Sequence, residues 1–233
     1  VSPGWVPQLG DAAQVMAGIA RRPGVRYAAL TPNLRGLEGA LAARADEVAI
    51  FGSASEGFSK ANINATIAES LERFAPVAAA ASVAGLPGRG YVSCVVECPY
   101  DGPVAPDAVA RVARALLDMG CYEISLGDTI GQGTPETIRN MLIAVLDRVP
   151  AGRLAGHYHD TGGRALDNIE MSLELGLRVF DAAVGGLGGC PYAPGAKGNV
   201  ATEKVHDRLT ALGLSTGLDR EVLGRAGDMA KAM

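Results

Sequence analysis

Two histidines separated by one residue give the strongest indication of chemistry in this sequence. They lie in the segment His157-Tyr158-His159-Asp160, at the end of a short apolar run. Alternate residues of a β-strand project from the same face, so His157 and His159 could both reach one metal ion while Tyr158 points away. The plainer interpretation is a pair of hydrogen-bonded polar side chains at a strand end. We expect His206, alone in a helix-like stretch, to lie at the surface.

A glycine-rich segment, residues 185–199, is the second indication. Such a density of glycine costs backbone entropy and is used where the backbone must move or approach a ligand closely. A mobile lid could hold Cys190 near a metal, which would lower the pKa of its thiol and let it donate and accept protons. The alternative is a flexible surface loop with an incidental thiol. Asn199, which closes the segment, suits a turn or helix cap as well as a metal site.

Asp128 is the third candidate, because it comes at the exit of a mostly apolar run in the sequence Leu126-Gly127-Asp128-Thr129. Burial at this point would raise the pKa of the carboxyl group and suit it to proton transfer or to orienting a ligand. The competing interpretation is an acid that caps the N-terminus of a helix.

Composition restricts the class of protein. The chain has 233 residues, 48% of them hydrophobic and 20% charged, which is typical of a globular core. With 21 basic and 25 acidic residues the net charge is −4, so we expect no nucleic-acid partner. No apolar stretch approaches the roughly 18 residues that a membrane span needs, so we expect no membrane association. Four cysteines without a CxxC pair indicate a reducing compartment, and we expect a cytoplasmic protein.

Short apolar runs alternate with longer helical patterns, which predicts an α/β fold built from parallel βαβ units. The expected strands are Val25–Leu30, Glu47–Phe51, Arg89–Val96, Tyr122–Leu126, Arg153–His159 and Val179–Val184. The expected helices are Asp11–Arg21, Leu34–Arg44, Lys60–Ala84, Pro106–Met119, Pro135–Arg148, Arg164–Leu175, Thr202–Leu212 and Asp219–Ala232.

Polar residues cluster directly after the predicted strands, which is typical of a TIM barrel or a doubly wound sheet. No Gly-x-Gly-x-x-Gly motif follows a first strand, so a nucleotide-binding sheet is disfavoured. A (β/α)8 barrel needs eight strands, and six are found, so we expect the first two βα units to be absent from the supplied chain. We expect residues 1–233 to form one catalytic domain, because no linker divides them.

The sequence resembles the 3-hydroxy-3-methylglutaryl-coenzyme A lyase family of metal-dependent TIM barrels. The segments that carry the resemblance are residues 1–8, 30–34, 90–94, 120–131, the His157 segment and the Cys190 segment. The His-x-His-Asp motif is shared with related synthases, whereas Gly-Leu-Gly-Gly-Cys-Pro together with the other segments is specific to the lyase.

The resemblance implies that His157, His159 and Asn199 bind a divalent cation, Mg²⁺ or Mn²⁺, with Cys190 as the catalytic thiol. It also implies that Asp128 and His157 assist catalysis and that Thr129 lines the substrate pocket. The implied reaction is a retro-Claisen cleavage of 3-hydroxy-3-methylglutaryl-CoA to acetyl-CoA and acetoacetate, as in leucine degradation and ketone body formation. The implied partner is an acyl-CoA substrate, and a homodimer is expected.

The sequence departs from the family pattern at its start, where the family's first strand carries an Arg-Asp pair and the next a glutamate that this chain lacks. We therefore expect the supplied chain to be an N-terminal truncation, inactive or nearly so, with open sheet edges prone to aggregation. At the glycine-rich segment, Ala183 and Gly185 stand in place of the family's usual serine and alanine.

Three alternatives stay open. A related lyase for longer hydroxyglutaryl-CoA esters would share every residue named above. A synthase or aldolase of the same superfamily would use the two histidines but would not need Cys190. The third alternative is a non-catalytic barrel fragment that serves as a binding module.

Overall fold

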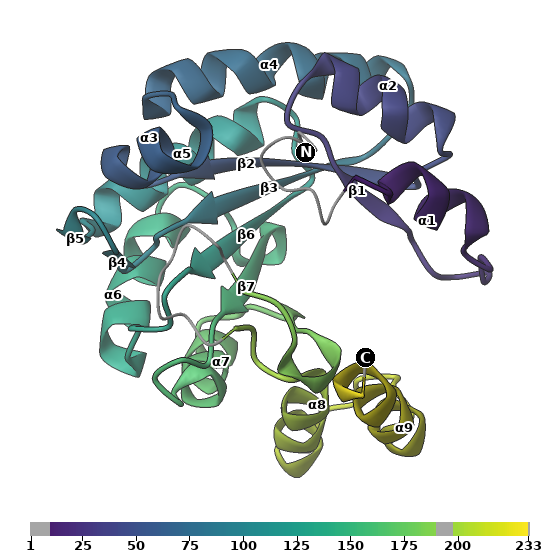
Figure 1. The fold of residues 1–233 in the computed structure, drawn as a ribbon. Coiled ribbons are helices and arrows are strands. Elements are labelled where there is room, and N and C mark those ends of the chain that lie inside the picture. Colours follow the sequence, from purple (N-terminus) through teal and green to yellow (C-terminus); the bar gives the residue numbers. More distant parts are fainter. Residues whose placement is uncertain (1–9, 190–197, 233) are drawn as a thin grey trace.

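The protein is described here from a computed structural model that covers residues 10–189 and 198–232. Its central feature is a sheet of six strands in the order β1-β2-β3-β6-β7-β8, with every neighbouring pair parallel. These strands are β1 (Ala28–Leu30), β2 (Glu47–Ser53), β3 (Gly88–Ser93), β6 (Glu123–Asp128), β7 (Leu154–Tyr158) and β8 (Val179–Asp181). The sheet curves into an open half-barrel with helices around its outer side, as Figure 1 shows. The predicted α/β architecture is confirmed.

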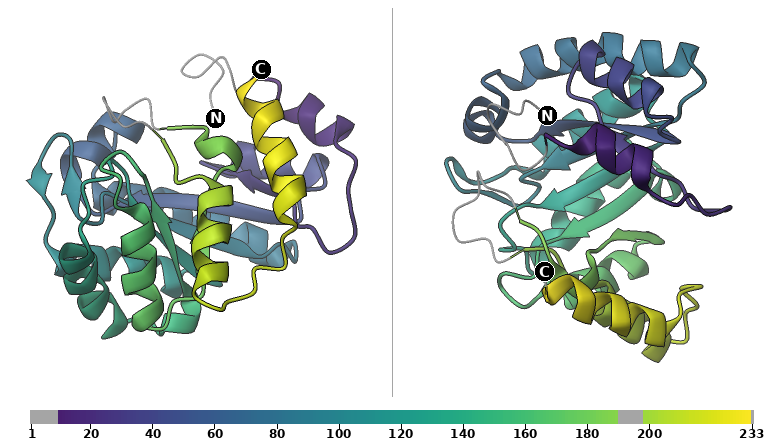
Figure 2. Two further views of the ribbon diagram at one scale, coloured as in Figure 1. Left: turned by 90° about the horizontal axis from the view of Figure 1, so that it is seen from below. Right: turned by 45° about the vertical axis from the view of Figure 1, so that its right-hand side comes forward.

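Helices connect the strands and continue past the last one. They are α1 (Ala12–Gly18), α2 (Leu34–Ala42), α3 (Glu56–Ile63), α4 (Ile67–Val83), α5 (Pro106–Asp118), α6 (Pro135–Leu146), α7 (Ala165–Glu174), α8 (Thr202–Ala211) and α9 (Arg220–Lys231). Two 3₁₀ turns, η2 (Ala151–Arg153) and η3 (Val184–Gly186), and a small hairpin, β4 (Glu97–Cys98) with β5 (Gly102–Pro103), complete the described chain. Figure 2 shows α8 and α9 lying side by side at the C-terminal end. In the described part of the chain, no helix is long and apolar enough to cross a membrane.

The prediction of one long helix over Lys60–Ala84 is wrong, because the chain forms the two helices α3 and α4 there. Asn64 ends α3 in the left-handed conformation, with φ of 49°. Thr66 then begins α4 with a capping box, in which the Thr66 hydroxyl accepts the Glu69 N–H and the Glu69 carboxylate accepts the Thr66 N–H. Each helix therefore has its own satisfied end, and the break is built into the sequence.

Two strands end three residues earlier than predicted. The strand expected over Arg89–Val96 stops at Ser93, because Cys94 takes a left-handed backbone with φ of 59°. The strand expected over Val179–Val184 stops at Asp181 and turns into η3. Both early ends place turns at the carboxyl edge of the sheet, where barrel enzymes carry their sites.

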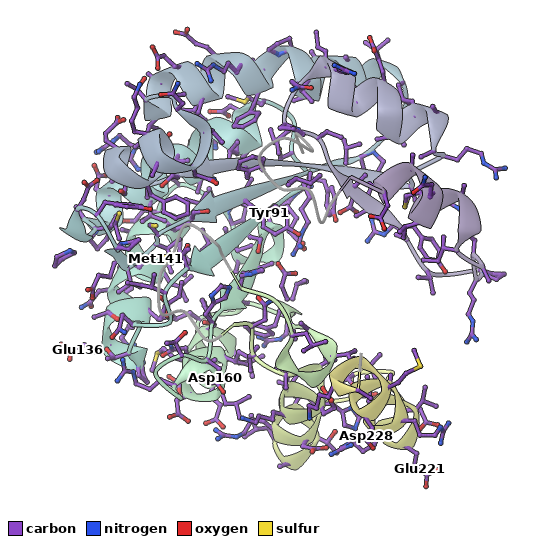
Figure 3. All side chains as sticks on the ribbon, viewed as in Figure 1. Tyr91, Glu136, Met141, Asp160, Glu221 and Asp228 are labelled. Atoms are coloured by element: carbon purple, nitrogen blue, oxygen red, sulfur yellow. The ribbon has the colours of Figure 1, made fainter. Side chains whose placement is uncertain are left out.

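The two faces of the sheet differ in chemistry. On β6, Ile124 and Leu126 are fully buried against the helices, where they pack with residues of α5 and α6 in one core. The alternate residues Glu123 and Ser125 face the concave side, where they contact other polar side chains. Figure 3 shows Tyr91 on this same side of the sheet. The outer face thus supplies the core, and the concave face is available for a site.

Candidate active site

The paired histidines lie at the carboxyl end of β7, on the concave side. Their ring centroids are 5.6 Å apart. Tyr158, between them, points the other way into the core, and its hydroxyl contacts the Ser172 hydroxyl at 2.8 Å. The strand alternation predicted from sequence therefore brings the two imidazoles together.

His159 is the more deeply buried of the two, with 6% of its surface exposed. Burial, reinforced by His157, lowers the pKa of His159 to about 4, although the Thr129 backbone and the Asn199 side chain act in the opposite direction. Its Nδ1 atom is buried and has no hydrogen-bond partner among the described residues. A neutral imidazole with an unpartnered buried nitrogen is the form in which histidine binds a metal.

Asn199 lies directly beside His159. The two residues form an antiparallel backbone bridge, and the Asn199 amide nitrogen donates to the Leu187 carbonyl at 3.1 Å. Gly198, with φ of 113°, packs so closely on Gly188 that an added Cβ would collide with the Gly188 carbonyl oxygen. This glycine contact joins the two described ends of the glycine-rich segment beside the bridge between Asn199 and His159.

These residues fit a divalent cation. In residues 10–189 and 198–232, no three His, Cys, Asp or Glu side chains form a metal-binding group. The donors available there are two imidazoles and one amide, with the orphaned nitrogen of His159 among them. Such a set is neutral, and Mg²⁺ and Mn²⁺ prefer carboxylate oxygens, so the described residues alone would bind these ions weakly.

Asp128 lies at the end of β6 with 1% exposure, but its carboxyl group faces the helices and not the histidines. It accepts backbone N–H groups of Gln132 at 3.2 Å and Gly133 at 2.8 Å. Burial raises the pKa of Asp128 in spite of these hydrogen bonds. The Asp128 backbone carbonyl, in turn, accepts the His159 N–H at 3.3 Å. Asp128 therefore shapes the turn beside the site and does not contact the imidazoles.

Thr129, which follows, is also buried, and its hydroxyl accepts the Cys94 N–H at 2.9 Å. This bond ties the end of β3 to the end of β6. Cys190 lies outside the described residues. Cys94, Cys98 and Cys121 are all buried. His206 is only partly exposed, and its Nδ1 contacts the Thr216 hydroxyl at 2.7 Å, so the expectation of a plain surface residue was too simple.

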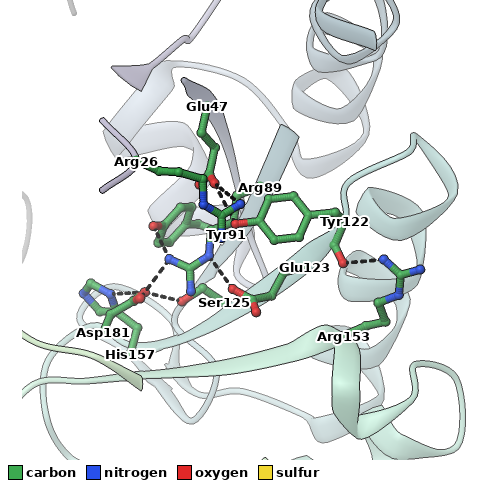
Figure 4. Close-up of polar contacts among 10 residues, drawn as sticks. All are labelled: Arg26, Glu47, Arg89, Tyr91, Tyr122, Glu123, Ser125, Arg153, His157 and Asp181. Atoms are coloured by element: carbon green, nitrogen blue, oxygen red, sulfur yellow. Dashed lines mark hydrogen bonds and ion pairs between the residues drawn. The ribbon is translucent and has the colours of Figure 1, made fainter. Parts of the chain in front are cut away.

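A charged cluster on the concave face was missed by the sequence reasoning, and Figure 4 shows it. Asp181 on β8 accepts from His157 Nδ1 at 3.1 Å, from the Ser125 hydroxyl at 2.7 Å and from Arg89 at 2.8 Å. Arg89 also binds Glu123 at 2.7 Å and the Tyr91 hydroxyl at 2.5 Å. The signal was present in the sequence, because each of these polar residues lies at an alternate position of a predicted strand.

Electrostatic attraction between Asp181 and Arg89 favours the charged form of both side chains. Burial alone would raise the pKa of Asp181, but His157, Arg89 and Ser125 together hold it below its usual value. Burial would likewise lower the pKa of Arg89, and the Asp181 charge and its other partners outweigh that effect. A carboxylate that is ionised accepts hydrogen bonds only, which fixes the direction of each contact to Asp181.

Comparison with known proteins identifies the family of this chain. Residues 4–229 match the HMGL-like family. The chain is 66% identical to the HMG-CoA lyase from Brucella melitensis, with a TM-score of 0.97 over 100% of this chain and 82% of that one. The chain belongs to the HMG-CoA lyase family. It is therefore an enzyme of the carbon–carbon lyase class.

Two further relatives describe the range of the family. A Pseudomonas aeruginosa protein named 3-hydroxy-3-isohexenylglutaryl-CoA/hydroxy-methylglutaryl-CoA lyase is 58% identical over 97% of this chain and 76% of its own length. A lyase from Acinetobacter baumannii, solved in complex with coenzyme A and 3-methylmalate, is 34% identical, with a TM-score of 0.94 over 100% of this chain and 76% of that one.

Proposed function

We propose that the protein cleaves 3-hydroxy-3-methylglutaryl-CoA to acetyl-CoA and acetoacetate at the carboxyl edge of the half-barrel. The observation that carries this proposal is the buried, neutral His159 beside His157 and Asn199, in a chain of the HMG-CoA lyase family. In the reaction the tertiary hydroxyl loses its proton and becomes the ketone of acetoacetate. The C–C bond breaks, and the departing acetyl-CoA enolate takes up a proton.

His157, His159 and Asn199 would hold a divalent cation, Mg²⁺ or Mn²⁺. The bound ion would supply Lewis-acid stabilisation of the substrate's hydroxyl and carboxylate oxygens. The arrangement that supports this role is the pair of imidazoles on one face of β7 with Asn199 bridged to His159. Because His159 is neutral over the physiological pH range, it needs no deprotonation before it binds.

We assign Cys190 the protonation of the departing enolate, as the family resemblance implies. Asp128 contributes through position: its carboxyl oxygens hold residues 131–133, and its carbonyl holds His159. Thr129 contributes in the same way, since its hydroxyl joins the ends of β3 and β6 and its backbone contacts the His159 ring. Through these contacts Asp128 and Thr129 position the backbone around His159.

The substrate is proposed to be an acyl-CoA thioester. Longer branched hydroxyglutaryl-CoA esters form a second candidate class, because the Pseudomonas aeruginosa relative is named for both kinds of substrate. We expect the enzyme to act in a reducing, cytoplasmic environment, because its four cysteines include no CxxC pair. A homodimer remains an expectation.

The 233-residue chain alone is proposed to turn over slowly or not at all. The reason is the neutral donor set of the described residues, which binds Mg²⁺ weakly. Turnover is therefore compared between the 233-residue chain and protein expressed with any codons upstream of Val1.

The experiment measures acetoacetate release from 3-hydroxy-3-methylglutaryl-CoA and from an isohexenyl analogue, by both forms of the protein, with Mn²⁺ and with chelator. Cys190→Ala distinguishes the reaction class, because a synthase or aldolase would keep its activity and a lyase would lose it. We expect Mn²⁺-dependent release that Cys190→Ala abolishes. Product formed equally well in chelator would contradict the proposal.

A further inference from the structure

We propose that Asp181 is a positioning residue that fixes the tautomer and the ring orientation of His157. With His157 Nδ1–H donated to the Asp181 carboxylate, the Nε2 lone pair is left to the cation. This inference rests on the proposed function for the role of the cation, but its first test needs no cation.

Asp181 and His157 are direct register partners on the parallel strands β8 and β7. Their side chains therefore project from the same face, and Asp181 Oδ2 lies 3.1 Å from His157 Nδ1. Only 31% of the His157 side chain and 20% of the Asp181 side chain are exposed. The contact is thus sheltered and built into the sheet register.

The other partners of Asp181 decide which way the proton lies. Arg89 donates to Oδ1 at 2.8 Å, and the Ser125 hydroxyl lies 2.7 Å from Oδ2. A carboxylate has no proton to give, so His157 Nδ1 must be the donor in its contact. Metal-binding histidines commonly use their second nitrogen in this manner, and losing the partner typically weakens metal binding about 10- to 100-fold.

Arg89 would fix which way a side-chain amide at position 181 turns, because a guanidinium can only donate hydrogen bonds. In Asp181→Asn, the amide oxygen should turn to Arg89, and the amide NH₂ should then face His157. His157 Nδ1 would have to accept from that NH₂, which shifts the ring proton to Nε2. The same exchange of carboxylate for amide puts a catalytic histidine into the wrong tautomer in serine proteases.

Glu123→Gln is the matched control. Glu123 also binds Arg89, at 2.7 Å, and is also largely buried, but no contact joins it to His157. Both substitutions therefore remove one negative charge from the same guanidinium. Only Asp181→Asn changes the group that faces the imidazole.

The first measurement is a long-range ¹H–¹⁵N spectrum of ¹⁵N-histidine-labelled protein without metal, at a pH above about 8, where imidazoles are neutral. His157→Gln and His206→Gln assign the signals. We expect His157 to be protonated on Nδ1 in the wild type and in Glu123→Gln, and on Nε2 in Asp181→Asn. A wild-type His157 protonated on Nε2 would overturn the proposal, even if the variant fails to fold.

The second measurement is Mn²⁺ binding by electron paramagnetic resonance, without substrate. We expect Asp181→Asn to bind Mn²⁺ about 10- to 100-fold more weakly than wild type, and Glu123→Gln to stay within about threefold. Equal losses in both variants would reduce the effect to net charge and overturn the positioning role. If the wild type binds no Mn²⁺ but shows the expected tautomer, the metal-dependent function fails while the orientation of His157 by Asp181 stands.

Discussion

Arg89 on β3 reaches Asp181 on β8 across the two strands that separate them, with 2.8 Å between Nη1 and Oδ1. In a flat sheet, three strand spacings of about 4.8 Å would put these backbones roughly 14 Å apart. The contact forms because the sheet curls and brings concave side chains together (Figure 4). The Arg89–Asp181 ion pair therefore depends on the curvature of the sheet, which also brings the residues of the candidate site together.

Arg89→Met should destabilise the fold strongly. It leaves the carboxylates of Asp181 and Glu123 without their common partner, in a setting where the Arg89 side chain is only 9% exposed. Breaking a buried pair in this way typically costs about 3–5 kcal/mol. Urea unfolding measures the loss. Arg114→Met is the control, because Arg114 pairs with Asp118 on the exposed face of α5 and its loss should leave the free energy of unfolding nearly unchanged.

Gly198→Ala should weaken Mn²⁺ binding while the rest of the fold persists. The new Cβ would collide with the Gly188 carbonyl and displace Asn199 from His159. Gly163→Ala is the control, since Gly163 also has a positive φ, of 69°, but has no atom near its missing Cβ. Equal Mn²⁺ affinities in the two variants would refute the role of the Gly198 contact.

Asp128→Asn separates proton transfer from positioning. The amide can accept only one of the two N–H groups that the carboxylate now accepts, so the free energy of unfolding should fall by about 1–3 kcal/mol. Activity and Mn²⁺ affinity should both fall, because the turn that positions His159 would shift. If activity drops about 100-fold or more while stability and Mn²⁺ affinity are unchanged, Asp128 acts as an acid or base and the positioning role is wrong.

Stability should depend on the Cys121 thiol at alkaline pH. Burial raises the pKa of Cys121 from 9.0 to about 11 in the folded protein. Between these pH values the Cys121 thiol ionises in the unfolded chain but not in the folded chain. The contribution of this thiol to the free energy of unfolding is therefore constant below pH 9 and falls as pH rises toward 11. The loss is at most about 2–3 kcal/mol. Urea unfolding at both ends of this window, for wild type and Cys121→Ala, measures it, and an identical decline in the two proteins would contradict the assignment.

Strand alternation made much of the fold and part of the site predictable. It gave parallel βαβ units, and it placed His157 and His159 on one face with Tyr158 on the other. The same rule, applied to β6, would have placed Asp128 with Ile124 and Leu126 on the outer side, away from the imidazoles. The catalytic role expected of Asp128 stays a prediction, because the printed contacts of its carboxyl group are with the turn at Gln132 and Gly133.

Other features depend on properties that local sequence does not encode. The contact of Arg89 with Asp181 needs the strand order and the curvature of the whole sheet. The end of α3 at Asn64 was locally encoded, since the Thr66-x-x-Glu69 capping box follows it. The prediction of one helix overlooked that signal, although Asn62, Asn64 and Thr66 are all poor helix formers. Alternating apolar residues predict a strand well, whereas its last residue depends on the turn that follows.

The most direct test of metal-dependent cleavage at the paired histidines is acetoacetate release from 3-hydroxy-3-methylglutaryl-CoA during a Mn²⁺ titration. Wild type, His159→Ala and His206→Ala are compared, with the protein expressed from any codons upstream of Val1. We predict saturable Mn²⁺-dependent release by wild type and His206→Ala, and none by His159→Ala. Release by His159→Ala at the wild-type rate and Mn²⁺ dependence would contradict the assignment of the site.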